Sequence, residues 1–367
     1  MKLQNLKKKL ISLDEINEKL KKHLDFEIYH ASENQFFVEL KPIEEYTKDS
    51  IVFLNNKKFI QYLNPQTPPK AVVTNKEIFL SIKESYPKTV FFVSKNVDVF
   101  RALFLQHFFD YELWDVKEEH YVHPSAEIHP SVELPQKIYV GPNVVIGENV
   151  KLGENVYLGA NVVIEAGVQI GDNTILFPNV YVGWGCIIGK NCRIHPGTVI
   201  GSEGFGFAQD EQFRHYRIPQ LGIVEIEDDV VIGANCCIDR ATYDKTIIRK
   251  GVITDNLIHV AHNCDIGENS ILVAQVGIAG SSKLGKRVIC SGQVGIADHV
   301  QIPDDTILLG RTAVLSDIPE SGIYLGYPAI PSAKFHRIQL HLQKLEEYAK
   351  EIKALKKRME ELEKKHQ

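Results

Sequence analysis

Two histidines stand three residues apart in the segment LIHVAHNCDIG, residues 257–267. Eighteen residues after His262 comes Gly280, and eighteen further on comes Asp298, followed by His299. A histidine ring titrates near neutrality, at about 6.5 in model peptides, which suits a general base. A glycine leaves its backbone N–H unobstructed, so that the amide can meet a developing oxyanion. We therefore predict acyl transfer by direct attack, in which His262 deprotonates an incoming amine or hydroxyl and the Gly280 amide holds the oxyanion.

Other interpretations of these histidines remain open. Surface histidines are common, and His259 fits a structural or peripheral role. His259, His262 and His299 could also act as zinc ligands, since zinc is often bound by histidine. The repeat described below predicts that residues eighteen apart stack on successive coils of the chain, about 4.8 Å apart. His262 and His299 would then be separated by about two coils, roughly 10 Å, which is too far for one chain to bring both to one ion. We therefore predict that the site uses no metal.

The elements that must position these residues are predicted by a repeat of six. Every sixth residue from Ile128 to Ile200 is a large aliphatic one, the pattern returns at Ile226, and it continues from Val260 to Val314 with Cys290 as the one substitute. Glycine often follows the aliphatic residue, and a smaller apolar residue often precedes it by two positions. Each hexad is one short strand and a turn, and three hexads form one triangular coil, so residues eighteen apart should stack at about 4.8 Å. The pattern predicts a mainly β protein built on a parallel β-helix.

Two interruptions and two flanks complete the predicted organisation. The segments GSEGFGFAQDEQFRHYRIPQLG and DRATYDKT break the register and should form loops, which in solenoids often lie on the binding face. We expect an α/β domain over residues 1–120, the β-helix over 121–318 and a helical extension over 319–367. Apolar residues at spacings of three and four in that extension predict a short coiled coil or bundle where subunits meet.

Composition limits the remaining possibilities. The net charge of −5 over 367 residues offers no basic field for nucleic acid, and no apolar run is long enough to span a membrane. The start of the chain has basic residues but no apolar h-region, so we expect a cytoplasmic protein without a signal peptide. The six cysteines lack CxxC-type spacing and are expected to be reduced, mostly buried thiols.

Specific segments add a family resemblance that covers nearly the whole chain. HPSAEIHPSVEL at the start of the repeats, both interruptions and DNLIHVAHNCDIGENSILVAQVGIAGS resemble the UDP-3-O-acylglucosamine N-acyltransferases of lipid A biosynthesis. The resemblance implies a left-handed β-helix, a homotrimer and active sites between neighbouring subunits. It also implies transfer of an (R)-3-hydroxyacyl group from acyl carrier protein to the 2-amine of a UDP-3-O-acyl-glucosamine. No bound cofactor is implied, because the carrier's phosphopantetheine holds the acyl group.

The resemblance also assigns residues in the β-helix. His262 takes the catalytic histidine's role, Gly280 the oxyanion-hole amide, and His299 an assisting role at the thioester. Asp255 and Asn256 fall on the family's aspartate and asparagine ahead of the histidine, and Asp255 could orient the ring. Asn256 is assigned to substrate binding, as is Asn263.

Outside the central repeats, the resemblance assigns a nucleotide site and a docking surface. In the segment FLNNKKF, Phe53 would stack on uracil and Asn56 would hydrogen-bond to it, while Phe59 replaces the family's usual tyrosine and loses its hydroxyl. The acidic carrier protein needs exposed basic residues near the end of the β-helix, and the candidates are Arg311, Lys334 and Arg337. The sister O-acyltransferase class acting on UDP-N-acetyl amino sugars, a zinc-dependent hydratase and a non-catalytic β-helix spacer remain alternatives.

Overall fold

The structure is a computed structural model that describes residues 8–31, 35–109 and 120–363. Compactness divides the chain once, into Met1–Asp115 and Val116–Gln367. The predicted divisions after residues 120 and 318 therefore stay predictions. Each unit is described by itself below.

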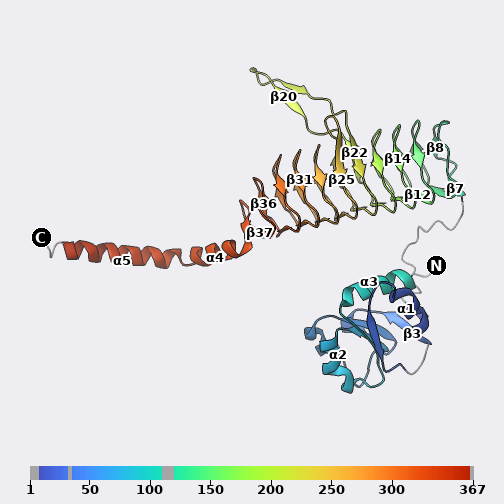
Figure 1. Cartoon of the computed structure of the whole chain (residues 1–367), viewed down its shortest axis with the longest axis horizontal. Helices are drawn as coiled ribbons and strands as arrows, with labels where there is room; N and C mark the ends of the chain where they lie inside the picture. The colour runs from blue at the N-terminus through green and yellow to red at the C-terminus, as the bar shows by residue number, and fades with distance from the viewer. Residues whose placement is uncertain (1–7, 32–34, 110–119, 364–367) are drawn as a thin grey trace. The chain divides into compact units, whose positions relative to one another are not determined.

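The first unit is a six-stranded sheet covered on both faces (Figure 1). The strand order is β1-β3-β4-β5-β6-β2, with β3 to β6 parallel and both edge strands antiparallel to their neighbours. Apolar side chains of α1 and α3 cover one face, and those of α2 cover the other. The elements are β1 (Lys8–Ser12), α1 (Leu13–Leu20), β2 (Phe26–Tyr29), β3 (Gln35–Leu40), η2 (Ile43–Glu45), β4 (Ser50–Leu54), η3 (Lys57–Tyr62), β5 (Ala71–Thr74), α2 (Lys76–Ile82), η4 (Lys83–Ser85), β6 (Val90–Ser94) and α3 (Val97–Phe108). The expected α/β architecture is confirmed.

The second unit contains three long sheets whose strands follow one another in turn along the chain, which confirms the parallel β-helix (Figure 1). The ten-stranded sheet comprises β8 (Glu127–Ile128), β10 (Val145–Ile146), β13 (Val163–Ile164), β16 (Tyr181–Val182), β19 (Val199–Ser202), β24 (Cys237–Asp239), β27 (His259–Val260), β30 (Gly277–Ile278), β33 (Gly295–Ile296) and β36 (Ala313–Val314). The eight-stranded sheet comprises β11 (Lys151–Leu152), β14 (Gln169–Ile170), β17 (Ile187–Ile188), β22 (Ile223–Ile226), β25 (Lys245–Ile248), β28 (Asp265–Ile266), β31 (Lys283–Leu284) and β34 (Gln301–Ile302). The twelve-stranded sheet comprises β7 (His120–Val122), β9 (Ile138–Val140), β12 (Val156–Leu158), β15 (Ile175–Leu176), β18 (Arg193–Ile194), β23 (Val231–Ile232), β26 (Ile253–Thr254), β29 (Ile271–Leu272), β32 (Ile289–Cys290), β35 (Ile307–Leu308), β37 (Ile323–Leu325) and β38 (Ile330–Pro331).

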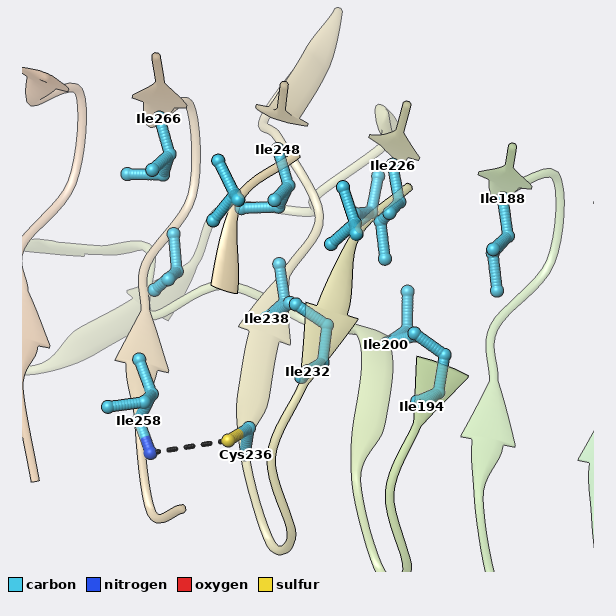
Figure 2. Packing of buried hydrophobic residues seen from close by; sticks show 14 of the residues in the cluster. Ile188, Ile194, Ile200, Ile226, Ile232, Cys236, Ile238, Ile248, Ile258 and Ile266 are labelled. Atoms are coloured by element: carbon cyan, nitrogen blue, oxygen red, sulfur yellow. Dashed lines mark hydrogen bonds between the residues drawn. The ribbon is translucent and has the colours of Figure 1, made fainter. Parts of the chain in front are cut away.

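The aliphatic residues of the repeat fill the interior of the coils. Figure 2 shows isoleucines from successive coils, such as Ile188 and Ile226, pointing into one shared core. Cys236 belongs to the same core, where its Sγ accepts a hydrogen bond from the Ile258 amide at 3.4 Å. Five of the six free cysteines are buried, and Cys237 is exposed. Burial raises the pKa of Cys264 to about 12, so this thiol is a packing residue.

The corners of the coils use residues that tolerate positive φ. Asparagine is the most frequent corner residue with positive φ, and Asn155, Asn173 and Asn191 stack as a ladder of side-chain hydrogen bonds of 2.9 and 3.2 Å. The glycine that follows the aliphatic residue has another purpose: at Gly153 a Cβ would lie 2.5 Å from the Asp172 amide nitrogen of the next coil. Close backbone approach between coils therefore selects these glycines, while asparagine tolerates the left-handed corner.

The first interruption and the tail form elements of their own, and the second interruption is the loop between β24 and β25. The first interruption carries the hairpin of β20 (Phe207–Gln209) and β21 (His215–Arg217), which projects from the coils in Figure 1. The tail forms α4 (Ser332–Leu342) and α5 (Leu345–Glu363), whose apolar side chains are exposed in this chain. No helix in the described ranges combines the length and apolar character needed to cross a membrane.

Candidate active site

His262 lies at a turn directly after β27, and the predicted stacking around it is present. Its carbonyl accepts a hydrogen bond from the Ser281 amide at 2.9 Å, and the Gly280 carbonyl accepts one from the His299 amide at 2.9 Å. Residues eighteen apart therefore do occupy successive coils. Among the described residues, no hydrogen-bond acceptor takes the Gly280 N–H, so this amide beside His262 remains available to a ligand.

A polar chain fixes the orientation of the His262 ring. His262 Nδ1 lies 2.9 Å from Asn263 Oδ1, and the Thr242 backbone amide donates to the same oxygen at 3.2 Å. Because a backbone amide can only donate, this atom of Asn263 is the acceptor, and His262 Nδ1 must be the donor. In the neutral ring the lone pair then lies on Nε2, which is the arrangement a general base requires.

Two glycines hold the ring between them. A Cβ at Gly280 would lie 2.6 Å from His262 Cε1 and 2.8 Å from Nε2. On the other side, a Cβ at Gly204 would lie 2.8 Å from His262 Cβ. Neither position can hold a side chain unless the His262 ring moves. Close packing therefore requires glycine at both positions, independently of the role predicted for the Gly280 amide.

The two interruptions fold together to supply the surroundings of His262. Gly204 and the buried Gln220 come from the first, and Thr242 comes from the second, where its hydroxyl donates to Gln220 Oε1 at 2.9 Å. Arg240 joins the bases of both segments: its buried guanidinium donates to the carbonyls of Gly201 and Gly222 at 2.9 and 3.2 Å. The expectation that the interruptions lie at the binding face is consistent with this placement.

A third nitrogen of that guanidinium extends the clamp to the coil before. It donates to the Trp184 carbonyl at 3.2 Å, and the guanidinium carbon lies 3.8 Å from the centre of the Trp184 ring. A desolvated cation–π contact of this kind adds to the hydrogen bonds. The Arg240 side chain therefore connects both ends of the segment that carries the hairpin to a regular coil.

Asp239, directly before Arg240, is a buried carboxylate at the same site. Its Oδ1 accepts a hydrogen bond from the Ser202 hydroxyl at 2.7 Å, and its Oδ2 lies 3.7 Å from His259 Nε2. Burial raises the pKa of Asp239, and this effect is opposed by the Ser202 hydrogen bond and by the nearby rings of His259 and His262. A carboxylate thus lies beside His259, on the strand that pairs with β27, and the turn that carries His262 follows β27.

A hollow of about 580 Å³ begins at His262 and extends along the ten-stranded sheet. Its floor consists of small residues that pair in register on neighbouring strands, namely Gly277, Gly295 and Ala313. Nothing lies within 4 Å of a Cβ placed at Gly277 or Gly295, so the floor is open above them. Leu315 and the exposed Phe205 also line the hollow. An apolar channel of small residues that leads to a histidine fits an acyl chain whose carbonyl ends at His262.

The structure separates some of the predicted residues from His262. The Asp255 carboxylate, expected to orient the ring, accepts hydrogen bonds from the amides of Asn256 and Ala274 at 2.8 and 3.2 Å, whereas Asn263 Oδ1 lies beside His262 Nδ1. A role for Asp255 at the site stays a prediction. Asn256 Oδ1 accepts from the Ala234 amide at 2.7 Å. His299 is exposed at a corner with φ 57°, one coil beyond Ser281, and is not part of the lining of the hollow.

The residues assigned to the nucleotide and to the carrier protein lie elsewhere in the chain. Phe53 is half-buried in β4 and packs edge-on against Phe104 at 6.1 Å, as a core residue would. Asn56 caps η3 through the Lys58 amide at 3.0 Å, and the half-buried Phe59 stacks on Tyr62. Their contacts with a nucleotide stay predictions.

The basic residues proposed for docking are exposed. Arg311 donates to Gln293 at 2.8 Å across one corner, while Lys334 and Arg337 lie on α4. Their role stays a prediction. Within the described ranges, no group of three or more His, Cys, Asp or Glu side chains is arranged to hold a metal ion.

The residues around His262 that were not anticipated from the sequence are Gly204, Gln220, Asp239, Arg240 and Thr242. One signal was available, because Asp239 and Arg240 directly follow the inward Ile238 at the point where the register breaks. Two charged residues next to a core position need buried partners. No comparable signal marked Gln220, whose place depends on how the hairpin folds back.

Family profiles and a solved structure resemble parts of this chain. The profile of the GMPPB C-terminal domain matches residues 116–204, and that of the hexapeptide repeat of succinyl-transferase matches residues 223–252. A structure of LpxA from Acinetobacter baumannii is 26% identical with a TM-score of 0.46, covering 57% of this chain and 72% of that one.

Curated relatives are more similar. The UDP-3-O-acylglucosamine N-acyltransferase of Methylococcus capsulatus is 44% identical over 333 residues, 91% of this chain and 93% of that protein. The enzyme of the same name from Desulfotalea psychrophila is 48% identical over 165 residues, 45% of this chain and 48% of its own length. The chain therefore belongs to the UDP-3-O-acylglucosamine N-acyltransferase family and is an N-acyltransferase of lipid A biosynthesis.

Proposed function

We propose that this chain transfers an (R)-3-hydroxyacyl group from the thioester of acyl carrier protein to the 2-amine of a UDP-3-O-acyl-glucosamine. The acceptor follows the name of the Methylococcus capsulatus relative. The observation that carries the proposal is the placement of His262 Nε2 and the Gly280 N–H together at the end of an apolar hollow. An amine nucleophile, a thioester carbonyl and an acyl chain can all be accommodated by this arrangement.

The reaction then proceeds by direct attack. The amine nitrogen forms a bond to the thioester carbonyl carbon while its proton passes to His262 Nε2, and the Gly280 N–H donates to the oxyanion. As the tetrahedral intermediate collapses, the carbon–sulfur bond breaks. The proton from the imidazolium goes to the leaving phosphopantetheine thiolate, which restores neutral His262 and yields an amide and a thiol. His299 is proposed to assist on the thioester side, and Asp255 and Asn256 to shape the same region from the adjoining corner.

The nucleotide and the carrier protein bind at separate places in this proposal. Phe53 stacks on uracil with Asn56 and Phe59 beside it, while Asn256 and Asn263 contact the sugar. The acidic carrier protein docks on Arg311, Lys334 and Arg337, whose exposed cations suit an anionic partner. Its phosphopantetheine, rather than any cofactor held by this chain, carries the acyl group.

A homotrimer with sites between subunits is part of the same proposal. Support comes from the twelve-stranded sheet, where Ile253, Ile271, Ile289, Ile307 and Ile323 pair in register on the outward face. Ile253 and Ile323 are 48% and 49% exposed in the single chain. A continuous apolar strip of this kind is typical of a subunit interface.

The test is mass spectrometry of the product formed from (R)-3-hydroxyacyl carrier protein and UDP-3-O-acyl-glucosamine, with His262→Ala in parallel. We expect one amide product from the unaltered chain and a loss of at least about a hundredfold in rate for the variant, the usual scale for a general base. An unimpaired variant would contradict the mechanism while leaving the reaction intact. No product over several chain lengths, with UDP-N-acetyl-glucosamine acylated instead, would favour the sister O-acyltransferase.

A further inference from the structure

Asp239 is a buried acid that the mechanism above does not use. It is the last residue of β24, which pairs with β19 and β27 in the ten-stranded sheet. The Ser202 hydroxyl from β19 and His259 from β27 face it, and the pairing of Ile238 with Val260 carries Asp239 alongside Ala261, directly before His262. The thiols of Cys237 on the same strand and of Cys264 are the other titratable groups that its charge reaches. Arg240, its neighbour in the chain, is directed to the carbonyls of Gly201, Gly222 and Trp184.

The proposed mechanism places a positive charge on His262 that its direct partner cannot balance. Asn263 fixes the ring through Oδ1, but an amide carries no net charge. Once an acyl chain and a sugar exclude water from the hollow, the cost of that charge increases. A catalytic histidine therefore gains from a carboxylate nearby even when the carboxylate does not touch it.

We propose that Asp239 is a positioning residue for acyl transfer: its buried carboxylate stabilises the imidazolium that forms on His262 when the amine proton moves to Nε2, and His259 competes for the same charge. The inference rests on the proposed role of His262. No bond is made or broken at Asp239, and the proton passes from the amine to His262 Nε2 and then to the thiolate. Asn263 thus supplies orientation and Asp239 supplies charge, from two different segments.

Substitution of His259 predicts the direction in which protonation of His262 should shift, and this direction can be measured. Its Nε2 is 3.7 Å from Asp239 Oδ2, so a proton on His259 would neutralise part of the carboxylate's effect and repel a proton on His262. Removing the carboxylate should make protonation of His262 harder. Removing the His259 ring should make it easier. Two single substitutions therefore shift the same titration in opposite directions.

The experiment is the pH dependence of kcat/KM for the full-length chain with carrier-bound thioester and the UDP-sugar. For Asp239→Asn, we expect kcat to fall about tenfold or more. The acid limb, which is the decline of kcat/KM at low pH, should move down by about one pH unit, because a nearby carboxylate favours the protonated His262 ring. For His259→Gln, the acid limb should move to higher pH. Asp265→Asn, which removes a carboxylate paired with Arg249 on the eight-stranded sheet, is the matched control and should leave the limb in place.

Thermal unfolding of each variant separates loss of fold from loss of charge. If Asp239→Asn does not fold, the upward shift in His259→Gln still tests the inference, and its absence overturns it. An acid limb that stays in place in a folded Asp239→Asn also overturns it, since a purely structural role lowers the rate without moving the titration. His262→Ala is measured alongside. If this variant keeps full turnover, both the proposed general base and the proposed role of Asp239 are wrong. If it is inactive while Asp239→Asn behaves like the unaltered chain, only the proposed role of Asp239 is wrong.

Discussion

At the scale of single residues, the site depends on how little space surrounds the His262 ring. Gly280 serves twice, since its N–H is unpaired among the described residues and its missing side chain leaves room for the ring edge. A methyl group there would lie 2.6 Å from Cε1, well inside contact distance. The ring would have to turn, and Nδ1 would lose Asn263.

Gly280→Ala is therefore expected to lower kcat by about a hundredfold or more, comparable to removing an oxyanion-hole donor, with little change in thermal stability. Steady-state kinetics and the melting temperature measure the two effects. Gly292→Ala is the control, because a Cβ there meets its nearest atom, the Ala274 carbonyl oxygen, at 3.5 Å. Equal kinetics for the two variants would show that close packing at His262 does not limit the reaction.

At the scale of elements, most residues around His262 come from the two segments that interrupt the six-residue repeat. Regular coils bring His262 and Gly280 together, but Gly204, Gln220, Asp239 and Thr242 all come from the two interruptions. Coil spacing alone cannot fold these segments back over the ten-stranded sheet. Arg240 does so by donating to one carbonyl at each end of the first interruption, at Gly201 and Gly222.

Arg240→Met should release the hairpin. Two buried carbonyl contacts, a partly buried one and the contact with the Trp184 ring would be lost. Each unpaired buried polar group costs about 1–3 kcal/mol, so we expect the free energy of unfolding to fall by on the order of 3 kcal/mol. Limited proteolysis should cut within residues 205–218, and turnover should fall together with it. Arg217→Met on the same hairpin removes only an exposed ion pair with Glu203, and should change stability by less than about 1 kcal/mol.

If Arg240→Met resists proteolysis and keeps its activity, the hairpin is held by other contacts. The comparison of two arginines on adjoining segments makes that outcome easy to recognise, since the substitution is the same in both.

The elements also show how far the sequence could predict this site. A period of six predicts strands, core and the eighteen-residue stack, because each of these follows from coil geometry repeated locally. The roles of Asp239 and Asn263 could not be obtained in this way. Whether Asp255 or Asn263 meets Nδ1 depends on which corner side chain points to the ring, and both residues lie at corners of the same coils. In this chain Asn263 lies beside Nδ1, while the Asp255 carboxylate accepts from two backbone amides, and the role of Asp255 stays a prediction.

At the scale of the whole molecule, the three outer faces of the β-helix differ in chemistry. In the later coils the eight-stranded sheet presents Asp265, Lys283 and Gln301, which suit water. The corresponding face of the twelve-stranded sheet presents the isoleucine strip defined above, and the ten-stranded sheet presents the floor of the hollow. One face is thus suited to solvent, one to another protein surface and one to a ligand, as expected if neighbouring copies complete each site.

Ile271→Asp tests this arrangement, because it places a charge in the middle of the strip, where burial against a second copy would be strongly unfavourable. Light scattering after size exclusion should give three times the chain mass of 41.5 kDa for the unaltered protein and a smaller assembly for the variant. Turnover should fall with assembly if each site needs two copies. Gln301→Asp adds the same charge to the solvent-facing sheet of a nearby coil and should leave both mass and turnover as they were. A variant at Ile271 that remains a trimer with full turnover would place the interface on another surface, and the exposed apolar side chains of α5 would be the next to change.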